Sequence, residues 1–355
     1  MTVTPGTVDL VGAGPSRHRM PARSAQRWLA RPVGWFQVGW SEEFPVGEAK
    51  PLRYFGFDLV AYRGESGTLH VFDAFCPHLG AHLGHGGKVC GDDIVCPFHG
   101  WRFDGAGENV DIPYSGRVNR AKRLVPWPVA ERSALVFLWH DPSGGTPAWD
   151  PPAIPVADEG WYPWWPDAVH RFDAVALYPQ FILENTVDLA HIKFVHGWDT
   201  VPDMAGLEEE PARFRSRFSG TLPTRDGVEH VDIATEAFGV GVIVSRLEGL
   251  RETIQVLCTT PVDEERSDVL ITVLVRRLDG DPSGERPGIV RAIVKAQTTG
   301  EWQKDAPIWL HQTYNPKAPF TGDEAPAFMA LRRWSARFYA DGDRALDDGD
   351  RGSGS

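Results

Sequence analysis

The sequence predicts an α+β chain of two domains, and three observations carry that prediction. Short strand-like runs fill residues 35–140, a connection dense in Pro and Gly follows at 141–167, and a helix-like stretch then leads into alternating segments and a helical end. A β region followed by a helix, a larger sheet and terminal helices is the pattern of an α+β architecture. The 355 residues are enough for about two domains of ordinary size.

Composition and charge limit the class of protein. The chain is 42% hydrophobic and 24% charged, as globular proteins usually are, and its formal net charge is −12. This acidic balance argues against nucleic acid or an anionic membrane surface as a partner. Four cysteines are too few for a disulfide scaffold, and no apolar run has the length of a signal peptide or a membrane span. We therefore expect a cytoplasmic protein without a membrane segment.

The two ends of the chain are expected to lie outside the domains. Residues 1–28 are rich in Pro, Ser, Arg and Gly without a sustained period, which predicts a disordered arm. The glycines of VDLVGAGPSRH do not form a dinucleotide fingerprint, because Arg17 replaces the third glycine and no helical pattern follows. Residues 341–355 predict an acidic disordered tail.

The first domain is predicted at residues 29–148. Its strand-like runs WFQVGW, FDLVAYR, TLHVFDAF and ALVFLWH are separated by Gly, Pro and Asp, which indicates a small antiparallel β domain. A Pro-rich linker is expected at 149–166. Its tryptophans are interpreted as packing against a domain face rather than binding a ligand: Trp161, Trp164 and Trp165.

The second domain is predicted at residues 167–340. It opens with the helix-like YPQFILENTVDLAHIKFVHGW and continues with the alternating VEHVDIATEAF, GVGVIVSRLEG and SDVLITVLVRRL, which indicate a second antiparallel sheet. The stretch APAFMALRRWSARFYA predicts a helical end. This sheet is expected to wall an apolar pocket, the usual setting for a bulky substrate.

The stretch CPHLGAHLGHGGKVCGDDIVCPFHGW (76–101) concentrates metal ligands on loops. Cys76-x-His78 and Cys96-x-x-His99 are Cys-His pairs with seventeen residues between them. Zinc sites usually group their cysteines and their histidines, whereas a [2Fe–2S] cluster with two thiolates on one iron and two imidazoles on the other suits mixed pairs. The spacing favours the cluster, with structural zinc as the alternative. The remaining Cys and His residues of the stretch fit neither spacing and are interpreted as loop or half-buried residues: His82, His85 and Cys90.

CPHLG and CPFHGW resemble the paired loops of the Rieske family. Respiratory Rieske proteins carry an extra cysteine in each loop, and Ala81 and Phe98 stand at those positions here. Because it lacks these cysteines, and therefore their disulfide, the domain resembles the oxygenase type of Rieske domain. The resemblance implies a [2Fe–2S] cluster held by four residues: Cys76, His78, Cys96 and His99.

A second group of candidate ligands lies in ENTVDLAHIKFVH, which contains Asn185, Asp188, His191 and His196. On a regular helix the two histidines would be about 140° apart, so the helix must distort or end between them if both bind one ion. Gly197 is a suitable stop. Helical histidines are often only packed, but beside a one-electron carrier they favour a mononuclear non-haem iron, which needs a carboxylate in addition.

ENTVDLAHIKFVH resembles the N-x-x-D-x-x-H-x₄-H signature of Rieske oxygenase catalytic subunits. That family draws its carboxylate from far downstream, and the best match here is Asp305 in QKDAPIW. Asp323 and Glu301 are the alternatives. The resemblance implies that Fe(II) is bound by His191, His196 and a carboxylate, and that Asn185 lies near these ligands.

The signature also implies a role for Asp188 other than metal binding. In the family this aspartate connects the outer cluster histidine of one subunit to an iron-binding histidine of its neighbour. By position, Asp188 would accept hydrogen bonds from His99 across an interface and from His191 within its own chain. This arrangement implies a ring of subunits, and the resemblance implies that the ring is a homotrimer.

The resemblance covers about residues 30–340 and implies a Rieske domain followed by a helix-grip catalytic domain. It is strongest to the branch of ketosteroid 9α-hydroxylases, cholesterol 7-desaturases and an aminopyrrolnitrin-type arylamine N-oxygenase. It implies a monooxygenase that uses O₂ to hydroxylate, desaturate or cyclise a bulky apolar substrate, steroid-like or polycyclic. No flavin, NAD or plant-type ferredoxin motif is present, so a separate reductase or ferredoxin would pass on the electrons of NAD(P)H. Arylamine N-oxygenation, O-demethylation, a Rieske electron carrier without catalytic iron and a zinc-stabilised binding module are the alternatives.

Overall fold

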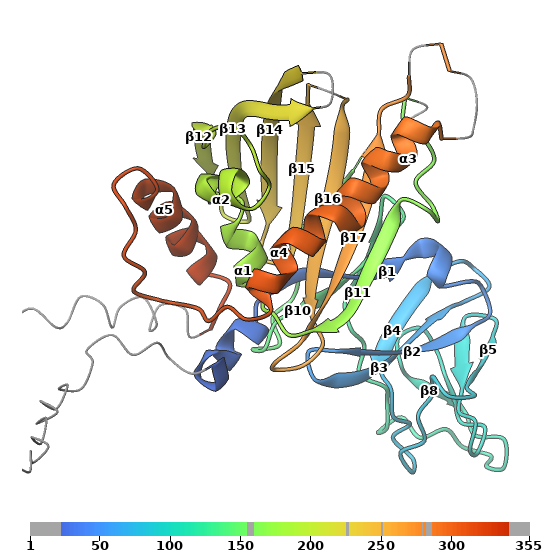
Figure 1. Ribbon diagram of the computed structural model, residues 1–355. Coiled ribbons are helices and arrows are strands. Elements are labelled where there is room, and N and C mark those ends of the chain that lie inside the picture. Colours follow the sequence, from blue (N-terminus) through green and yellow to red (C-terminus); the bar gives the residue numbers. More distant parts are fainter. Residues whose placement is uncertain are drawn as a thin grey trace, which may run out of the picture.

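The computed structural model describes residues 23–154, 160–224, 227–249, 251–278, 280–281 and 286–340. Figure 1 shows a region of small sheets in blue and cyan beside a larger region in which helices cross one broad sheet. The predicted α+β class of antiparallel sheets is confirmed. The domain boundaries drawn from the sequence stay predictions.

Three small antiparallel sheets build the N-terminal region, with strand orders β1-β10-β9, β2-β3-β4 and β5-β6-β7-β8. The strands predicted from WFQVGW, FDLVAYR, TLHVFDAF and ALVFLWH are β1, β3, β4 and β10. The elements of this region are η1 (Arg23–Ala30), β1 (Gly34–Trp40), η2 (Ser41–Glu43), β2 (Ala49–Tyr54), β3 (Phe57–Arg63), β4 (Leu69–Asp73), β5 (Lys88–Cys90), β6 (Asp93–Val95), β7 (Arg102–Phe103), β8 (Asn109–Asp111), β9 (Val129–Arg132) and β10 (Leu135–His140).

One antiparallel sheet of seven strands forms the C-terminal region, in the order β11-β17-β16-β15-β14-β13-β12. Helices α1 and α2 and the continuous α3-η3-α4 segment lie over one face of it, which is the predicted helix-grip arrangement (Figure 1). The elements are β11 (Val169–Val175), α1 (Pro179–Glu184), α2 (Leu189–Phe194), β12 (Asp203–Glu209), β13 (Arg213–Thr224), β14 (Gly227–Phe238), β15 (Val242–Glu248), β16 (Thr253–Pro261), β17 (Ser267–Val275), α3 (Gly288–Lys295), the π-helical η3 (Ala296–Gly300), α4 (Glu301–Trp309) and α5 (Ala325–Ala336).

The main hydrophobic core joins this sheet to the helices and to β1 and β10. Strand β17 is buried along its whole length because helices cover one of its faces and N-terminal residues approach the other; Trp40 Nε1, for example, donates to Thr272 Oγ1 over 2.8 Å. Trp161 and Trp164 belong to this core, and Trp165 packs against it. The interpretation of these tryptophans as packing residues is confirmed.

The prediction of a disordered arm to residue 28 is wrong at its end, because residues 23–28 belong to the 3₁₀ helix η1. Gln26 is buried there: its Nε2 donates to the carbonyl of Tyr314 over 2.7 Å, and its Oε1 accepts from the Tyr314 N–H over 2.9 Å. This pairing with a segment 288 positions away is invisible in local composition. The remainder of the predicted arm and the predicted acidic tail (341–355) lie outside the described residues.

Candidate active site

Two loops of the N-terminal region repeat the same backbone pattern. The N–H of Cys76 donates to the carbonyl of residue 81 and the N–H of Cys96 to that of residue 101, each over 2.8 Å. In return, the N–H groups of Gly80 and Gly100 donate to the carbonyls of Cys76 and Cys96. Both glycines have positive φ, +75° and +73°, a conformation that glycine adopts without strain. The glycine four residues after each cysteine therefore lets the two loops form matching cradles.

The cysteines and histidines of these loops divide by depth. Cys76 and Cys96 are buried, and burial raises the pKa of the Cys76 thiol to about 12. His78 and His99 are half-buried, with ring centroids 4.8 Å apart. His99 Nδ1 is buried without a hydrogen-bond partner among the residues that the structure describes. Two buried sulfurs and two half-buried imidazoles, one with an unpaired nitrogen, fit the donor set of a Rieske cluster.

The other histidines and the remaining cysteine of the loops lie apart from this set. His82 is half-buried and its Nδ1 accepts from the N–H of Gly84, while His85 and Cys90 are exposed. All four cysteines of the chain are free. His82 and His85 agree with their interpretation as loop or half-buried residues, whereas Cys90 is an exposed residue at the end of strand β5, so that interpretation is wrong for Cys90.

The second candidate site begins at the break between α1 and α2. The expected single helix is interrupted at residues 185–188, and α2 ends at Phe194, between His191 and His196, as binding of one ion by both histidines requires. Gly197 follows with φ +78°. The two imidazole centroids lie 5.1 Å apart.

Asp188 caps the N-terminus of α2. Its Oδ1 accepts from the N–H of His191 over 3.1 Å, and its backbone carbonyl pairs with His191 Nδ1. Asp188 therefore accepts a hydrogen bond from His191 within the chain, but from its backbone N–H, and the ring meets the Asp188 carbonyl instead. The Nε2 of His191 is the ring nitrogen left for a metal.

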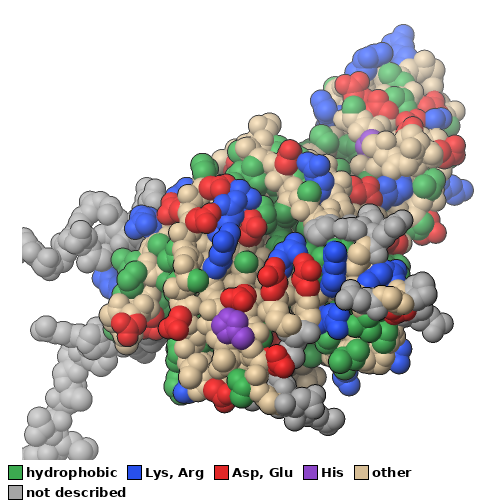
Figure 2. Space-filling model, turned by 90° about the horizontal axis from the view of Figure 1, so that it is seen from above, with side chains coloured by type: hydrophobic (Ala, Val, Ile, Leu, Met, Phe, Trp, Pro, Cys, Tyr) green, Lys and Arg blue, Asp and Glu red, His purple; other side chains and the backbone are tan. Residues whose placement is uncertain are grey.

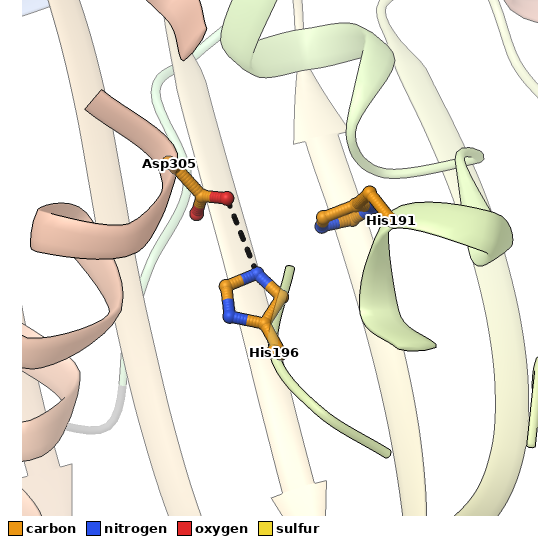
Figure 3. A group of neighbouring side chains, drawn as sticks. All are labelled: His191, His196 and Asp305. Carbon is orange, nitrogen blue, oxygen red and sulfur yellow. Dashed lines mark ion pairs between the residues drawn. The ribbon is translucent and has the colours of Figure 1, made fainter. Parts of the chain in front are cut away.

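Asp305 reaches the histidines from α4 on the opposite side, as Figure 3 shows. Its Oδ1 lies 3.3 Å from His196 Nε2, whereas His196 Nδ1 contacts Glu301 one turn earlier on the same helix. One ligand atom from each of His191, His196 and Asp305 lies within 4.8 Å of the others. Two imidazoles and one carboxylate are the donor set of a mononuclear non-haem iron site, so these residues fit the metal.

Charge at this site favours a cation. Burial alone would lower the pKa of His196, but the carboxylates of Asp305 and Glu301 raise it to about 9. Burial lowers the pKa of His191. A positive charge between the carboxylates is thus stabilised, which is the electrostatic condition for holding a metal ion.

The residues predicted around the mononuclear iron lie close together, with the exception of Asp323. Asn185 lines the same pocket as the three candidate ligands, and Glu301 lies against His196. Asp323 is exposed, lies beyond α4 and is not part of the group. Asp305 is therefore the carboxylate that the geometry favours.

A cavity of about 400 Å³ opens beside the candidate ligands. Strands β13 to β17 form one wall, and α2 with the α3-η3-α4 segment forms the other. Its lining is mostly aliphatic and aromatic, with residues such as Phe218, Ile233, Leu257, Ile271 and Trp302. The predicted apolar pocket on the second sheet is confirmed.

One polar residue of this pocket was not predicted from the sequence: Gln297 of η3. The available signal was the spacing of Gln297, Glu301 and Asp305, which recur every four residues and share one side of a helical segment. The spacing could be interpreted only if the whole segment from Gly288 to Trp309 had been predicted as helical, as the structure shows it to be.

Figure 2 shows one face of the molecule with acidic and basic side chains in different colours. Acidic and basic side chains are interspersed there without a continuous basic patch. Among the described residues, no helix combines the length and apolar character needed to cross a bilayer.

Comparisons with known proteins identify a family for each of the two regions of the chain. The family model of the Rieske [2Fe-2S] domain matches residues 34–122, and that of the 3-Ketosteroid 9alpha-hydroxylase C-terminal domain matches residues 138–339. The first match favours the cluster over structural zinc, and the second disfavours a chain that only carries electrons.

Curated relatives align over most of the chain. A probable 3-ketosteroid-9-alpha-monooxygenase, oxygenase component, of Rhodococcus rhodochrous is 30% identical over 336 residues, which cover 87% of this chain and 80% of that protein. Cholesterol 7-desaturase of Hemicentrotus pulcherrimus is 29% identical over 340 residues, covering 89% and 71%. A crystal structure of dicamba monooxygenase with non-heme iron and dicamba has a TM-score of 0.65 at 19% identity, covers 87% of this chain and 97% of that one, and shares the fold. The chain therefore belongs to the Rieske non-haem iron monooxygenases, in the family whose catalytic half is the 3-ketosteroid 9α-hydroxylase C-terminal domain.

Proposed function

We propose that the protein oxidises a bulky, steroid-like molecule, by hydroxylation or desaturation, in the cavity beside His191, His196 and Asp305. The observation that carries the proposal is that the three candidate ligands line one apolar cavity of about 400 Å³. Cavities of roughly 300–1,000 Å³ with apolar walls and few polar groups are typical of small-molecule sites. Relatives named for a 3-ketosteroid and for cholesterol support a polycyclic apolar substrate.

The side chains of the site have separable tasks in this proposal. Asp188 directs His191 through its carbonyl, and Glu301 lies at the Nδ1 side of His196, so both rings offer Nε2 toward Asp305. An Fe(II) ion held by these three residues would supply the activation of O₂. The apolar walls exclude water and position the substrate carbon next to the ligands.

We also infer that the working unit is a homotrimer in which one subunit's cluster serves its neighbour's catalytic site. Within one chain, the loops around β5 to β8 and helix α2 lie at opposite ends of the molecule (Figure 1). Leu79 and Phe98, beside the cluster histidines, are 65% and 62% exposed and offer an apolar surface for a neighbour. Asp188 would connect His99 of one subunit to His191 of the next.

A separate reductase or ferredoxin would supply the electrons, since relatives are named as oxygenase components. The cytoplasmic location of the protein stays a prediction. Arylamine N-oxygenation and O-demethylation need the same ligands, but no feature of the cavity favours them over a steroid-like substrate.

A single-turnover assay tests the proposal. The iron-loaded chain, reduced chemically without a partner protein, is mixed with air and with 3-ketosteroids, 3-hydroxysteroids, arylamines or aryl methyl ethers. We expect a steroid product whose mass has increased by 16 or decreased by 2, the changes expected of hydroxylation and desaturation. Product from the arylamine or the ether alone would contradict the steroid-like substrate.

His191→Ala is the control for the site. This variant should keep the visible absorption of the cluster and form no product, because it lacks one of the three candidate ligands. Turnover by His191→Ala at the wild-type rate would show that the proposed ligand set is wrong.

A further inference from the structure

A small polar group interrupts the apolar lining of the cavity. Thr253 and Gln255 on β16 and Gln297 on η3 line it together, facing each other from the sheet and the helical wall. Polar side chains in an otherwise apolar pocket usually fix the orientation of a ligand.

Their hydrogen bonds hold the Gln297 amide in place. Gln255 Nε2 donates to the backbone carbonyl of Gln297 over 2.8 Å, and Gln297 Nε2 donates to Thr253 Oγ1 over 2.9 Å. Gln297 Oε1 is buried and accepts no hydrogen bond from any residue within the described ranges. A buried acceptor without a partner costs free energy that a bound donor would recover.

The place of Gln297 in the helix sets its distance from the candidate metal ligands. It lies in the π-helical turn η3, and such turns often occur at functional sites. Gln297 precedes Asp305 by eight residues, which is roughly 12 Å along the axis at about 1.5 Å per residue. Ile293 and Trp302 line the same cavity from the neighbouring turns. Gln297 therefore lines a part of the pocket remote from Asp305.

We propose that Gln297 accepts a hydrogen bond from a hydroxyl group at the end of the substrate that is remote from the oxidised carbon. The inference rests on the proposed function and narrows its substrate class to elongated apolar alcohols. A ketone at that end offers only an acceptor, and it would meet the Gln297 oxygen without a hydrogen between them. A hydrocarbon end would leave the oxygen unpaired. The pocket therefore selects the alcohol over both.

Equilibrium binding without O₂ tests this selection apart from catalysis. The full-length, metal-loaded protein is titrated with a 3-hydroxysteroid, its 3-keto analogue and its 3-deoxy analogue, and binding is followed by the fluorescence of the tryptophans that line the cavity, Trp198, Trp302 and Trp309. We expect the alcohol to bind about ten- to a hundredfold more tightly than the other two, the range for pairing a buried acceptor. In Gln297→Met the three dissociation constants should converge.

Thr235→Val is the matched control. Thr235 lines the same cavity, but its hydroxyl already pairs with Ser245 Oγ at 3.1 Å, so the ratio between alcohol and ketone should persist in this variant. A wild-type protein that binds the ketone as well as the alcohol, or a Gln297→Met variant that keeps the preference, overturns the inference. The wild-type preference decides the matter even if Gln297→Met does not fold.

The proposed function fails in a different way. If none of the three steroids binds, both the steroid-like substrate and the role of Gln297 toward it are wrong. If all three bind equally and one is oxidised, the proposed function stands and only the inference about Gln297 is wrong.

Discussion

His140 gives a prediction about stability whose size can be worked out from its surroundings. This residue ends β10 and is 6% exposed. Its ring stacks on Phe55 with centroids 4.0 Å apart, and its Nδ1 pairs with the carbonyl of Pro32 at 2.6 Å. Burial lowers the pKa of His140 from 6.5 to about 4.

The direction of the effect follows from which state binds the proton. Below pH 6.5 the unfolded chain protonates His140 while the folded protein keeps the ring neutral, so stability falls as the pH falls toward 4. These two pKa values correspond to a loss of about 2 kcal/mol at pH 5 and about 3 kcal/mol at pH 4. Above pH 7 the contribution is flat.

His140→Phe isolates this effect because phenylalanine keeps the ring stack and cannot bind a proton. The variant should be less stable at pH 7.5, by about 1–3 kcal/mol, since the carbonyl of Pro32 loses its donor. Urea unfolding of both proteins at pH 7.5 and pH 5 measures the difference in unfolding free energy, from which other titrating groups cancel. That difference should shrink by about 2 kcal/mol at pH 5. A difference that stays the same at both pH values refutes the reasoning.

Three further predictions concern the framework of the sites. Arg332→Met removes the buried bidentate partner of Glu184 and should lower the free energy of unfolding in urea by about 3–5 kcal/mol. The double variant with Glu184→Gln should recover most of this loss, and a loss below about 1 kcal/mol in Arg332→Met would contradict the prediction. Gly100→Ala forces φ +73° on a residue with a Cβ, so iron and acid-labile sulfide should fall, whereas exposed Gly116→Ala should lose neither. Asp188→Asn should keep both metals but slow reoxidation of the reduced cluster by O₂ and substrate; unchanged reoxidation argues against the bridge.

The candidate ligands could be predicted because their spacing is set by chemistry rather than by distant contacts. Each Cys-His pair sits on one short loop, and the glycine that the loop requires follows at a fixed position. His191 and His196 are similarly close in sequence, so their convergence needed only a helix end between them. The strands could be predicted for the same reason, because the alternation of apolar and polar residues that indicates a strand lies within the strand itself.

Long-range contacts account for what the sequence did not reveal. Gln26 looks like an ordinary polar residue of a loose arm, and only the backbone of Tyr314 explains its burial. Gln297 belongs to no motif in the sequence, and only its contact with Thr253 of β16 explains its place in the wall of the cavity.

Iron and sulfide analysis of the purified, fully loaded chain tests the existence of two separate metal centres most directly. The Cys76, His78, Cys96 and His99 set predicts two irons and two acid-labile sulfides, and the His191, His196 and Asp305 set predicts one iron more. Wild type should therefore contain about three irons and two sulfides per chain, and His191→Ala about two irons with the same sulfide. Zinc in place of iron, or about two irons in both proteins, would contradict the account.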